Sequence, residues 1–499
     1  MKAINHIENY LQESQTSPQK KANVDPVDEI LPLGQMLVYG FQHVLVMYAG
    51  AIAVPLIIGK AVGFTPEQII FLISTDLFIC GCGTILQSIG LFNIIGSKLP
   101  IVQGCTFAAL IPMTLIGQQY GIGGISGAVI VAGMFTLLCA PFVCKLVRFF
   151  PKAVMGTIVT LIGLSILPVA GGWIGGGDLD AVSFGSYGSL LMALFTLGVV
   201  MLIYTFGKGM LKNVAVLVGI IIGTLGYYFM GKLDLSQVAS TSWMTFPYPM
   251  RFAVPEFHLF PAVLMCMVMV VVMVETMSSM MAMGEIVDRP ADQKTLKRGL
   301  YACGSATLFG GFFNMFPYAA FAQNVGLVSM TGVRSRFIVG VAGCILITLG
   351  LFPKLAAFVV AVPKPVLGGA GIVMFGMVAV SGIRTLGQVD YRNNNNGMVV
   401  ALTLGLGMLP VMVPQLFQQM PQAAEMFLHS GITIGTVVAI GANLILNGRD
   451  RQAKIPGCKE CELQEVNENS TAAREVFSTT REYIAMRRKR QNAQKNAAL

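Results

Sequence analysis

Long apolar runs recur along this chain between about residue 36 and residue 447. Each run of about 20 residues is long enough for a helix to cross a hydrocarbon core of ~30 Å. Hydropathy predicts fourteen such segments, centred near Leu45, Phe78, Ala108, Ala132, Leu161, Phe195, Val218, Met269, Leu308, Val325, Cys344, Val373, Leu404 and Val438. The third and the tenth are short and interrupted by polar residues. The pattern predicts an all-α polytopic membrane protein.

The most informative polar interruption lies in the tenth segment, where Gln323 and Asn324 stand in an otherwise apolar run. Each side-chain amide carries two donors and an acceptor, and burying it unpaired costs several kcal/mol. Polar side chains at membrane depth therefore tend to face a cavity, a partner or a substrate. Gly326 and Gly332 follow, and they predict a helix that breaks where backbone lines protein or a cavity. We expect a binding site in this segment.

Two short sequences recur at a separation of seven segments. Residues 150–156 (FPKAVMG) open the fifth segment and 362–368 (VPKPVLG) open the twelfth, while 102–104 (VQG) resemble 322–324 (AQN). Because seven is odd, such partners cross the membrane in opposite directions. This is the inverted repeat of secondary transporters, which bind substrate near the midplane on discontinuous helices. Chance similarity is the alternative, and the shared separation makes it weaker.

The repeats divide the chain into a transporter domain between two polar tails. We expect a tail over 1–34, a transporter domain over 35–448 and a tail over 449–499. Within the domain, the first repeat spans about 35–232 and the second about 257–448.

Lysine and arginine set the expected orientation, because they concentrate in cytoplasmic loops. Only 11% of residues are charged. The net charge of +9 is explained by the lysines and arginines of these loops, so it does not indicate nucleic-acid binding. With the N-terminus inside, the cytoplasmic loops hold fourteen cations: Lys98, Lys145, Arg148, Lys152, Lys208, Lys212, Arg289, Lys294, Lys297, Arg298, Arg334, Arg336, Arg384 and Arg392. The opposite side holds five: Lys60, Lys232, Arg251, Lys354 and Lys364. Both tails are therefore expected in the cytoplasm, with no cleavable signal peptide.

The C-terminal tail carries two minor features. Cys458 and Cys461 form a single CxxC, and without a second pair they indicate reduced thiols rather than a metal site. The basic run 487–490 (RRKR) is a solvated end or a contact to anionic lipid heads.

Three ionisable residues lie inside predicted spans, where each is a functional candidate. Glu275 in the eighth span must find donors or hold a proton, so it is a candidate to accept N–H groups from a ligand or to carry a proton. A bond to a neighbouring helix is its structural alternative. His43 in the first span is equally consistent with a ligand and with a satisfied core histidine. Asp76 in the second span could relay protons, although bonding between helices is the simpler role.

The third segment combines three chemistries within five residues. Gln103 supplies an amide, Thr106 a hydroxyl and Phe107 an aromatic face, a mixture that suits a flat heterocycle with a polar edge. The sequence contains no HExxH, GxSxG or paired catalytic carboxylates, so we expect a transporter and not an enzyme. An anion exchanger or channel is the alternative, although inorganic anions favour helix N-termini and a cation, and no cation lies beside Gln323.

Several motifs resemble one family in the same order. The pattern Q-N-x-G-x4-T-G over 323–332 resembles the signature of the nucleobase–ascorbate transporters, also called nucleobase–cation symporters. The pair Gln42-His43, the eighth-span Glu275 and the sequence TGVRSR over 331–336 resemble that family too. The resemblance covers about residues 31–448 and is strongest to bacterial xanthine and uric acid permeases.

This resemblance implies an architecture and a site. Segments one to four and eight to eleven would form a core domain, and segments five to seven and twelve to fourteen a gate domain, with short strands in segments three and ten. Glu275 and Gln323 would hydrogen-bond a purine base and Phe107 would pack on it, with Asn324 and His43 in support. It also implies a homodimer in the bacterial inner membrane that takes up xanthine or uric acid with a proton and needs no cofactor. A uracil-type symporter remains a further alternative.

Three positions depart from the pattern of the better-known xanthine carriers. Ser279 stands one turn after Glu275 where an Asp is expected, and Cys303 occupies an expected acid position in the ninth span. Thr106 stands where many xanthine-selective members have Asn. The smaller side chain would leave room for the extra carbonyl of uric acid.

Overall fold

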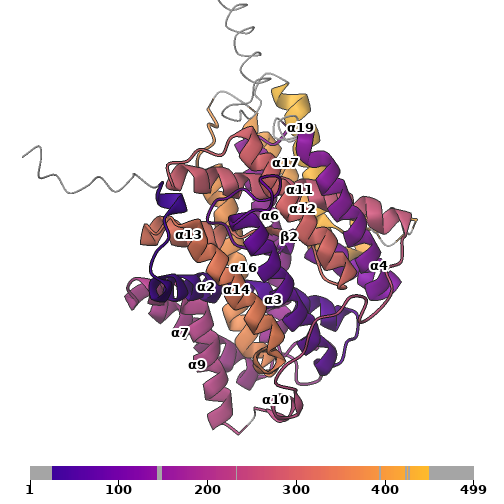
Figure 1. The fold of residues 1–499 in the computed structure, drawn as a ribbon. Coiled ribbons are helices and arrows are strands. Elements are labelled where there is room, and N and C mark those ends of the chain that lie inside the picture. The colour runs from indigo at the N-terminus through magenta and orange to yellow at the C-terminus, as the bar shows by residue number, and fades with distance from the viewer. Residues whose placement is uncertain are drawn as a thin grey trace, which may run out of the picture.

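Helices form nearly all the regular structure of the computed structural model, which describes residues 25–142, 149–231, 233–392, 395–417, 419–421, 424 and 427–448 (Figure 1). The helices of the first half are α2 (Leu33–Ala61), α3 (Pro66–Ser88), α4 (Leu110–Cys139), α6 (Lys152–Ile174), α7 (Tyr187–Phe206), α8 (Met210–Asn213), α9 (Ala215–Phe229) and α10 (Ser236–Ser240). Those of the second half are α11 (Leu259–Ile286), α12 (Gln293–Phe312), α13 (Ala322–Thr331), α14 (Arg336–Leu351), α15 (Pro353–Val360), α16 (Lys364–Leu386), α17 (Asn396–Met412) and α19 (Gly431–Asn447). Two strands, β1 (Gln103–Cys105) and β2 (Tyr318–Ala320), and the 3₁₀ turns η1 (Pro26–Asp28), η2 (Phe107–Ala109), η3 (Ala140–Phe142) and η4 (Pro414–Phe417) complete it.

The apolar helices confirm a polytopic membrane protein. Within the described residues, seven helices are long and apolar enough to cross a membrane, or eight if the pair α14 and α15, bent by 77°, counts as one. Three shorter apolar helices, α9, α17 and α19, have 15 to 17 residues. Each predicted segment centre lies in a helix, or in η2 for Ala108. The total of fourteen spans stays a prediction.

The predicted third and fourth segments form one continuous apolar stretch from Phe107 to Phe142, of 36 residues. A straight helix of that length would measure about 54 Å, well beyond a hydrocarbon core of ~30 Å. Gly121 interrupts it with φ 64° and ψ −168°, a backbone conformation that favours glycine. The stretch is therefore broken into two segments at this glycine.

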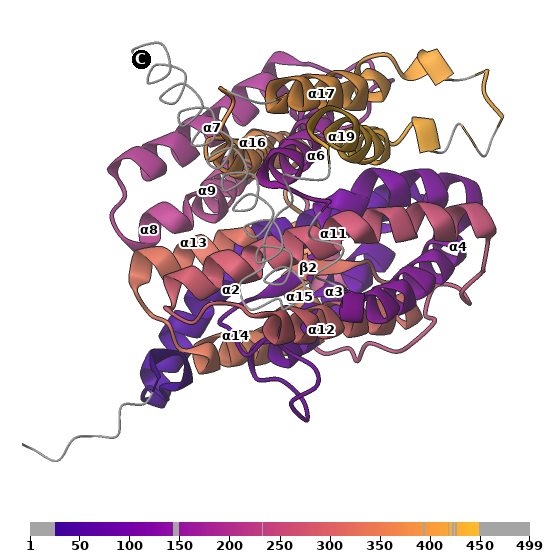
Figure 2. The same ribbon diagram turned by 90° about the horizontal axis from the view of Figure 1, so that it is seen from above.

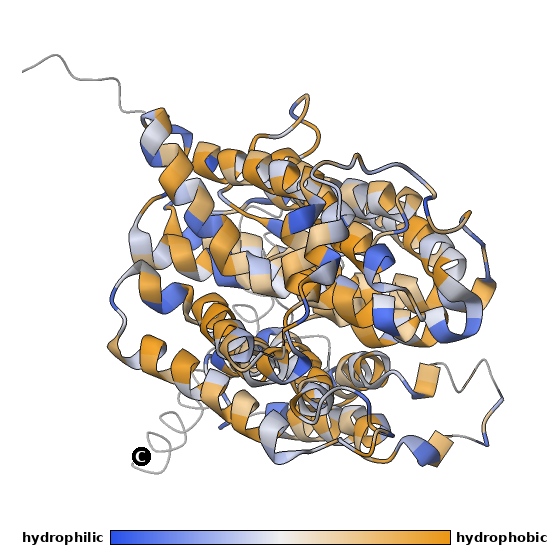
Figure 3. Cartoon of the chain, turned by 90° about the horizontal axis from the view of Figure 1, so that it is seen from below, coloured by the Kyte–Doolittle hydropathy of each residue, from blue (hydrophilic) through white to orange (hydrophobic). Residues whose placement is uncertain are grey.

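The helices pack in two sets, which Figure 2 shows side by side. In the first set, α3 packs on α14, α4 on α12 and α11, and α2 on α14 and α3. In the second set, α6 packs on α16, α17 and α19, and α7 packs on α16 and α9. Hydrophobic residues run along most helices of both sets (Figure 3). On α7 only 22% of the apolar stretch is buried inside the protein, as expected of a helix that faces lipid.

A short antiparallel ladder joins the two halves of the chain inside the first set. Gln103 of β1 pairs with Ala320 of β2, and Cys105 pairs with Tyr318. Each strand is also held by a threonine from the helix before it. The N–H of Gln103 donates to Thr84 Oγ1 over 3.0 Å, and the N–H of Tyr318 donates to Thr307 Oγ1 over 3.1 Å. The fold thus places two non-helical backbones against each other among buried helices.

The ladder corrects the match that the sequence suggested between 102–104 and 322–324. The strand that pairs with β1 is 318–320, and Gln323 lies beyond it in the first turn of α13. Gln103 is therefore a strand residue and Gln323 a helix residue, so the two glutamines do not occupy equivalent places. Gln323 comes shortly after the end of β2 at Ala320. The corresponding positions in the first half of the chain are those after the end of β1, from Thr106 onward.

Candidate functional site

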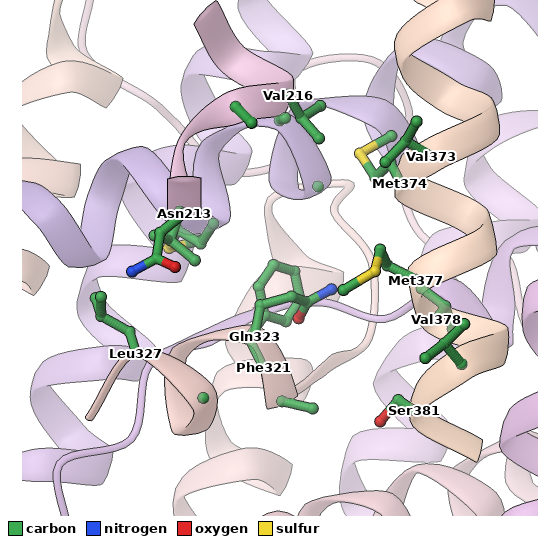
Figure 4. Close-up of a pocket in the computed structure, with 18 of the residues that line it drawn as sticks. Asn213, Val216, Phe321, Gln323, Leu327, Val373, Met374, Met377, Val378 and Ser381 are labelled. Carbon is green, nitrogen blue, oxygen red and sulfur yellow. The ribbon is translucent and has the colours of Figure 1, made fainter. Parts of the chain in front are cut away.

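A cavity of about 370 Å³ lies between the two helix sets. The first set lines it with residues of α2, α11 and α13, and the second with residues of α6, α7, α9 and α16. Figure 4 shows α13 residues facing Met377 and Ser381 of α16 across it. A cavity at a boundary between helix sets is a common place for a small ligand.

Glu275 of α11 lines this cavity together with Thr106. Its carboxyl is within hydrogen-bonding reach of the Thr106 side chain. The second carboxyl oxygen, Oε2, is buried and has no hydrogen-bond partner among the described residues. A buried acceptor without a partner is costly, so this oxygen is free to accept an N–H from a ligand.

Gln323 places a second polar group in the same cavity from the first turn of α13. It is half-buried, and no described residue hydrogen-bonds its side-chain amide. Figure 4 shows the side chain directed toward Met377. The amide can donate and accept at once, which suits the alternating donors and acceptors on the edge of a nucleobase.

Aromatic rings bound the cavity beside these polar groups. Phe107 and Phe321 both line it and are almost fully buried. The Phe107 ring packs edge-on against Phe375 of α16, with 5.8 Å between ring centroids. The second helix set therefore fixes the orientation of Phe107, whose face is a possible packing surface for a flat ligand.

Asn324 and His43 lie behind the cavity and bond to each other. The Asn324 side-chain amide donates to the His43 backbone carbonyl over 2.9 Å and lies 3.1 Å from His43 Nδ1. Both are buried, and neither lines the cavity. The pair ties α13 to α2 next to Gln323, which is a supporting position and not a contact position.

Gln103 is also turned away from the cavity. Its amide donates to Gln87 Oε1 over 3.1 Å, and Gln87 in turn donates to Ser97 over 3.0 Å. Gln103 is fully buried and does not line the cavity. The direct substrate contact that the sequence suggested for Gln103 does not fit this position, because its amide nitrogen bonds to Gln87 of α3 and its unpartnered Oε1 is buried away from the cavity.

Two further candidates, Asp76 and Cys303, contact Tyr318 of β2. Asp76 accepts a hydrogen bond from the hydroxyl of Tyr318, and Cys303 donates to the Tyr318 carbonyl. Ser279 is buried on α11, and none of these residues lines the cavity.

Sequence reasoning missed Tyr318 and Gln87, because a polar residue in a span indicates that a partner exists but not which one. The described residues contain no group of three or more His, Cys, Asp or Glu side chains that could hold a metal ion. Cys458 and Cys461 lie outside the described residues.

Comparisons with known proteins find permeases of similar sequence. A family model described as a permease family, Xan_ur_permease, matches residues 34–416. The chain is 42% identical to a xanthine permease of Bacillus subtilis over 432 residues, which cover 87% of the chain and 98% of that relative. It is 43% identical to the uric acid transporter UacT of Escherichia coli over 434 residues, covering 86% and 90%.

Solved structures show the same fold at much lower identity. The transmembrane domain of the cyanobacterial bicarbonate transporter BicA aligns with a TM-score of 0.54 and 16% identity, covering 84% of the chain and 99% of that domain. The murine anion transporter Slc26a9 aligns with a TM-score of 0.55 and 14% identity, covering 88% of the chain and 75% of Slc26a9. These likenesses extend to the fold alone.

Proposed function

Because the chain belongs to the xanthine/uracil permease family and is therefore a transporter, we propose that it carries xanthine or uric acid inward across a bacterial inner membrane together with a proton. The relatives that support this proposal include both a xanthine permease and a uric acid transporter at nearly equal identity. Overall identity therefore does not rank the two bases. The preference for xanthine or uric acid must therefore depend on the side chains that line the cavity.

The observation that carries the proposal is the pair of unpartnered polar groups in one cavity. Glu275 presents an acceptor, and Gln323 presents both a donor and an acceptor. A dioxopurine carries N–H donors and carbonyl acceptors in alternation around its ring, and these two side chains complement that edge. Phe107 and Phe321 would contact the ring itself. A site that hydrogen-bonds its ligand in this way discriminates strongly against analogues that lack the matching groups.

Transport requires the cavity to open to each side in turn. Its walls belong to different helix sets, since Glu275 and Gln323 come from the first and the α16 residues from the second. We infer that the first set acts as the core and the second as the gate of two inverted repeats. Movement of one against the other would open and close the cavity, which is the alternating access typical of secondary transporters. The antiparallel pairing of β1 and β2 supports this reading.

The cavity reaches toward the side that the loop charges assign to the cytoplasm. Lys212 and Arg384, both assigned to cytoplasmic loops, line it. The described cations assigned to the opposite side, Lys60, Arg251, Lys354 and Lys364, do not. This supports an inward-open arrangement.

Uptake of radiolabelled xanthine tests the proposal. Unlabelled xanthine or uric acid should compete, and a proton uncoupler should prevent accumulation. Glu275→Gln should abolish accumulation, because the amide cannot take up and release a proton and presents an N–H to the ligand where a carboxylate oxygen stood. Glu285→Gln, an exposed change on the same helix, is the matched control and should transport normally. Normal accumulation by Glu275→Gln would refute the proposed role of Glu275 in coupling.

A further inference from the structure

A tight hairpin over residues 91–95 lies in the connection between α3 and β1. The N–H of Ile94 donates to the Leu91 carbonyl over 3.0 Å and closes the turn. Phe92 and Asn93, the two central residues, have φ of 48° and 57°, as in the type I′ turns of two-residue hairpins. This left-handed conformation is unfavourable for a bulky side chain. The aromatic residue at the turn therefore needs a compensating contact.

The base of the 91–95 hairpin is bonded to two helices of the first set. The N–H of Gly96 donates to the Arg298 carbonyl of α12 over 2.9 Å. The N–H of Lys98 donates to the Gln87 carbonyl of α3 over 3.1 Å. The hairpin is thus presented from a fixed base.

The tip of the hairpin carries apolar side chains that the described part of the chain leaves uncovered. Phe92 is 84% exposed, Ile94 is 60% exposed, and Leu91 is exposed as well. Residues 89–102 include no acid, and their one cation is Lys98. Apolar side chains with a basic residue beside them are typical of segments that lie in a membrane interface.

The hairpin lies at the level where the membrane ends. Helix α3 ends at Ser88 after 23 residues, a length of about 35 Å that is enough to cross a hydrocarbon core of ~30 Å. The hairpin begins shortly afterwards, at Leu91, on the side that the loop charges assign to the cytoplasm.

The direction of the hairpin also points to lipid. Figure 2 shows α12 and α14 lengthwise, and the purple loop that follows α3 projects across their direction at the lower edge of the molecule. Most of this loop is hydrophobic (Figure 3). A loop that projects across the spans extends along the membrane and not out into the cytoplasm.

A second copy of the chain is the other possible occupant of the tip. Stable interfaces between proteins bury about 800 Å² on each partner and involve roughly 20–30 residues a side. The tip offers three exposed apolar residues, Leu91, Phe92 and Ile94, which is far below that size. Insertion among acyl chains needs no complementary surface, so lipid fits this small tip better.

We propose that the 91–95 hairpin is a lipid-binding element. It inserts Phe92 and Ile94 among the acyl chains of the cytoplasmic leaflet, with Lys98 at the level of the anionic head groups. Burial of the ring in lipid compensates for the unfavourable backbone conformation at the turn. Because the hairpin leads into β1, it holds that end of the strand at a fixed depth in the membrane. This role does not depend on which solute is transported.

Photo-crosslinking identifies what the tip contacts. The full-length Phe92→p-benzoylphenylalanine variant is placed in nanodiscs of phosphatidylcholine and phosphatidylglycerol, irradiated and analysed by peptide mass spectrometry. The matched control carries the same photoreactive residue in place of Lys294, an exposed polar residue in the first turn of α12. Phospholipid adducts should be at least about tenfold more frequent at position 92 than at position 294. Equal frequencies would overturn the proposal, and so would adducts formed chiefly with a second copy or with residues 449–499.

Two further variants separate lipid contact from packing within the protein. Phe92→Gly removes the ring and suits the left-handed backbone, so the melting temperature in detergent should stay the same or rise. A fall would mean that the ring stabilises the protein itself and would overturn compensation by lipid. In nanodiscs, Ile94→Cys should react with a water-soluble maleimide at least about fivefold more slowly than Lys294→Cys, with each modified peptide quantified by mass spectrometry. Equal rates would place the hairpin in water and overturn the proposal.

Discussion

The phenolic hydroxyl of Tyr318 donates a hydrogen bond to Oδ1 of Asp76 across 2.9 Å. Cys80 lies 3.6 Å from the other carboxyl oxygen, and Cys303 donates to the Tyr318 carbonyl over 2.9 Å. Tyr318 and Asp76 are both fully buried. Tyr318 of β2 therefore links Asp76 of α3 to Cys303 of α12. None of the three residues lines the cavity.

This bond predicts a structural role for Asp76. Tyr318→Phe removes the donor and leaves a buried carboxyl short of a partner, a loss of about 1–3 kcal/mol, so we expect a lower melting temperature in detergent. Asp76→Asn keeps an oxygen that can accept from Tyr318 and should retain uptake. If Asp76→Asn instead lost uptake while its melting temperature stayed normal, the ionisable carboxyl itself would be required for transport.

The spans were predictable because the bilayer fixes their length and composition. The ladder between β1 and β2 was not predictable from residue patterns, because each strand has three residues and the partners are more than two hundred residues apart. No alternation of polar and apolar residues develops over three positions. Only the resemblance to a known family led us to expect strands there.

Residues of the site could be predicted only where a polar residue stands in an apolar segment of the sequence. Glu275 and Gln323 are conspicuous in apolar segments, and both line the cavity. Gln103 is equally conspicuous, yet it bonds to Gln87. The residues of α16 that close the other side, such as Met377, resemble any membrane-facing residue in sequence. Their role follows from the packing of the two helix sets, which no local pattern encodes.

Asn324 should act through His43 and not through the ligand. Asn324→Asp removes the donor to the His43 carbonyl and sets a carboxylate against it, so we expect uptake to fall roughly tenfold or more. Gln323 and the first turn of α13 would shift, and all bases should be affected alike. Competition assays with several purines check this. A changed order of preference among the bases would mean that Asn324 contacts the ligand directly.

Gly104 is expected to tolerate no side chain. A Cβ at this strand position would lie 2.7 Å from the ring of Phe321, which lines the cavity. Gly104→Ala should therefore displace that ring and reduce uptake strongly, and a second change, Phe321→Leu, should restore part of it by making room. Gly171→Ala on α6, where nothing lies within 4 Å of a Cβ, is the control. Normal uptake by Gly104→Ala would show that the ring moves without consequence.

Thr106 should set the preference between the two candidate bases. Its hydroxyl accepts from the N–H of Ala108 over 3.1 Å and caps η2, while the side chain lines the cavity beside Glu275. Asn caps helical turns as well as Thr does, so Thr106→Asn should preserve the turn and extend an amide into the cavity.

The added volume should exclude the larger base first. We expect the kcat/KM for urate uptake to fall about tenfold or more relative to that for xanthine, whereas Thr106→Ser keeps the hydroxyl and should leave the ratio near that of the wild type. Initial rates of both labelled bases over a range of concentrations provide the comparison. An equal loss for both bases in Thr106→Asn would mean that the residue shapes the site as a whole, because a selectivity role requires the extra carbonyl of uric acid to meet the new amide.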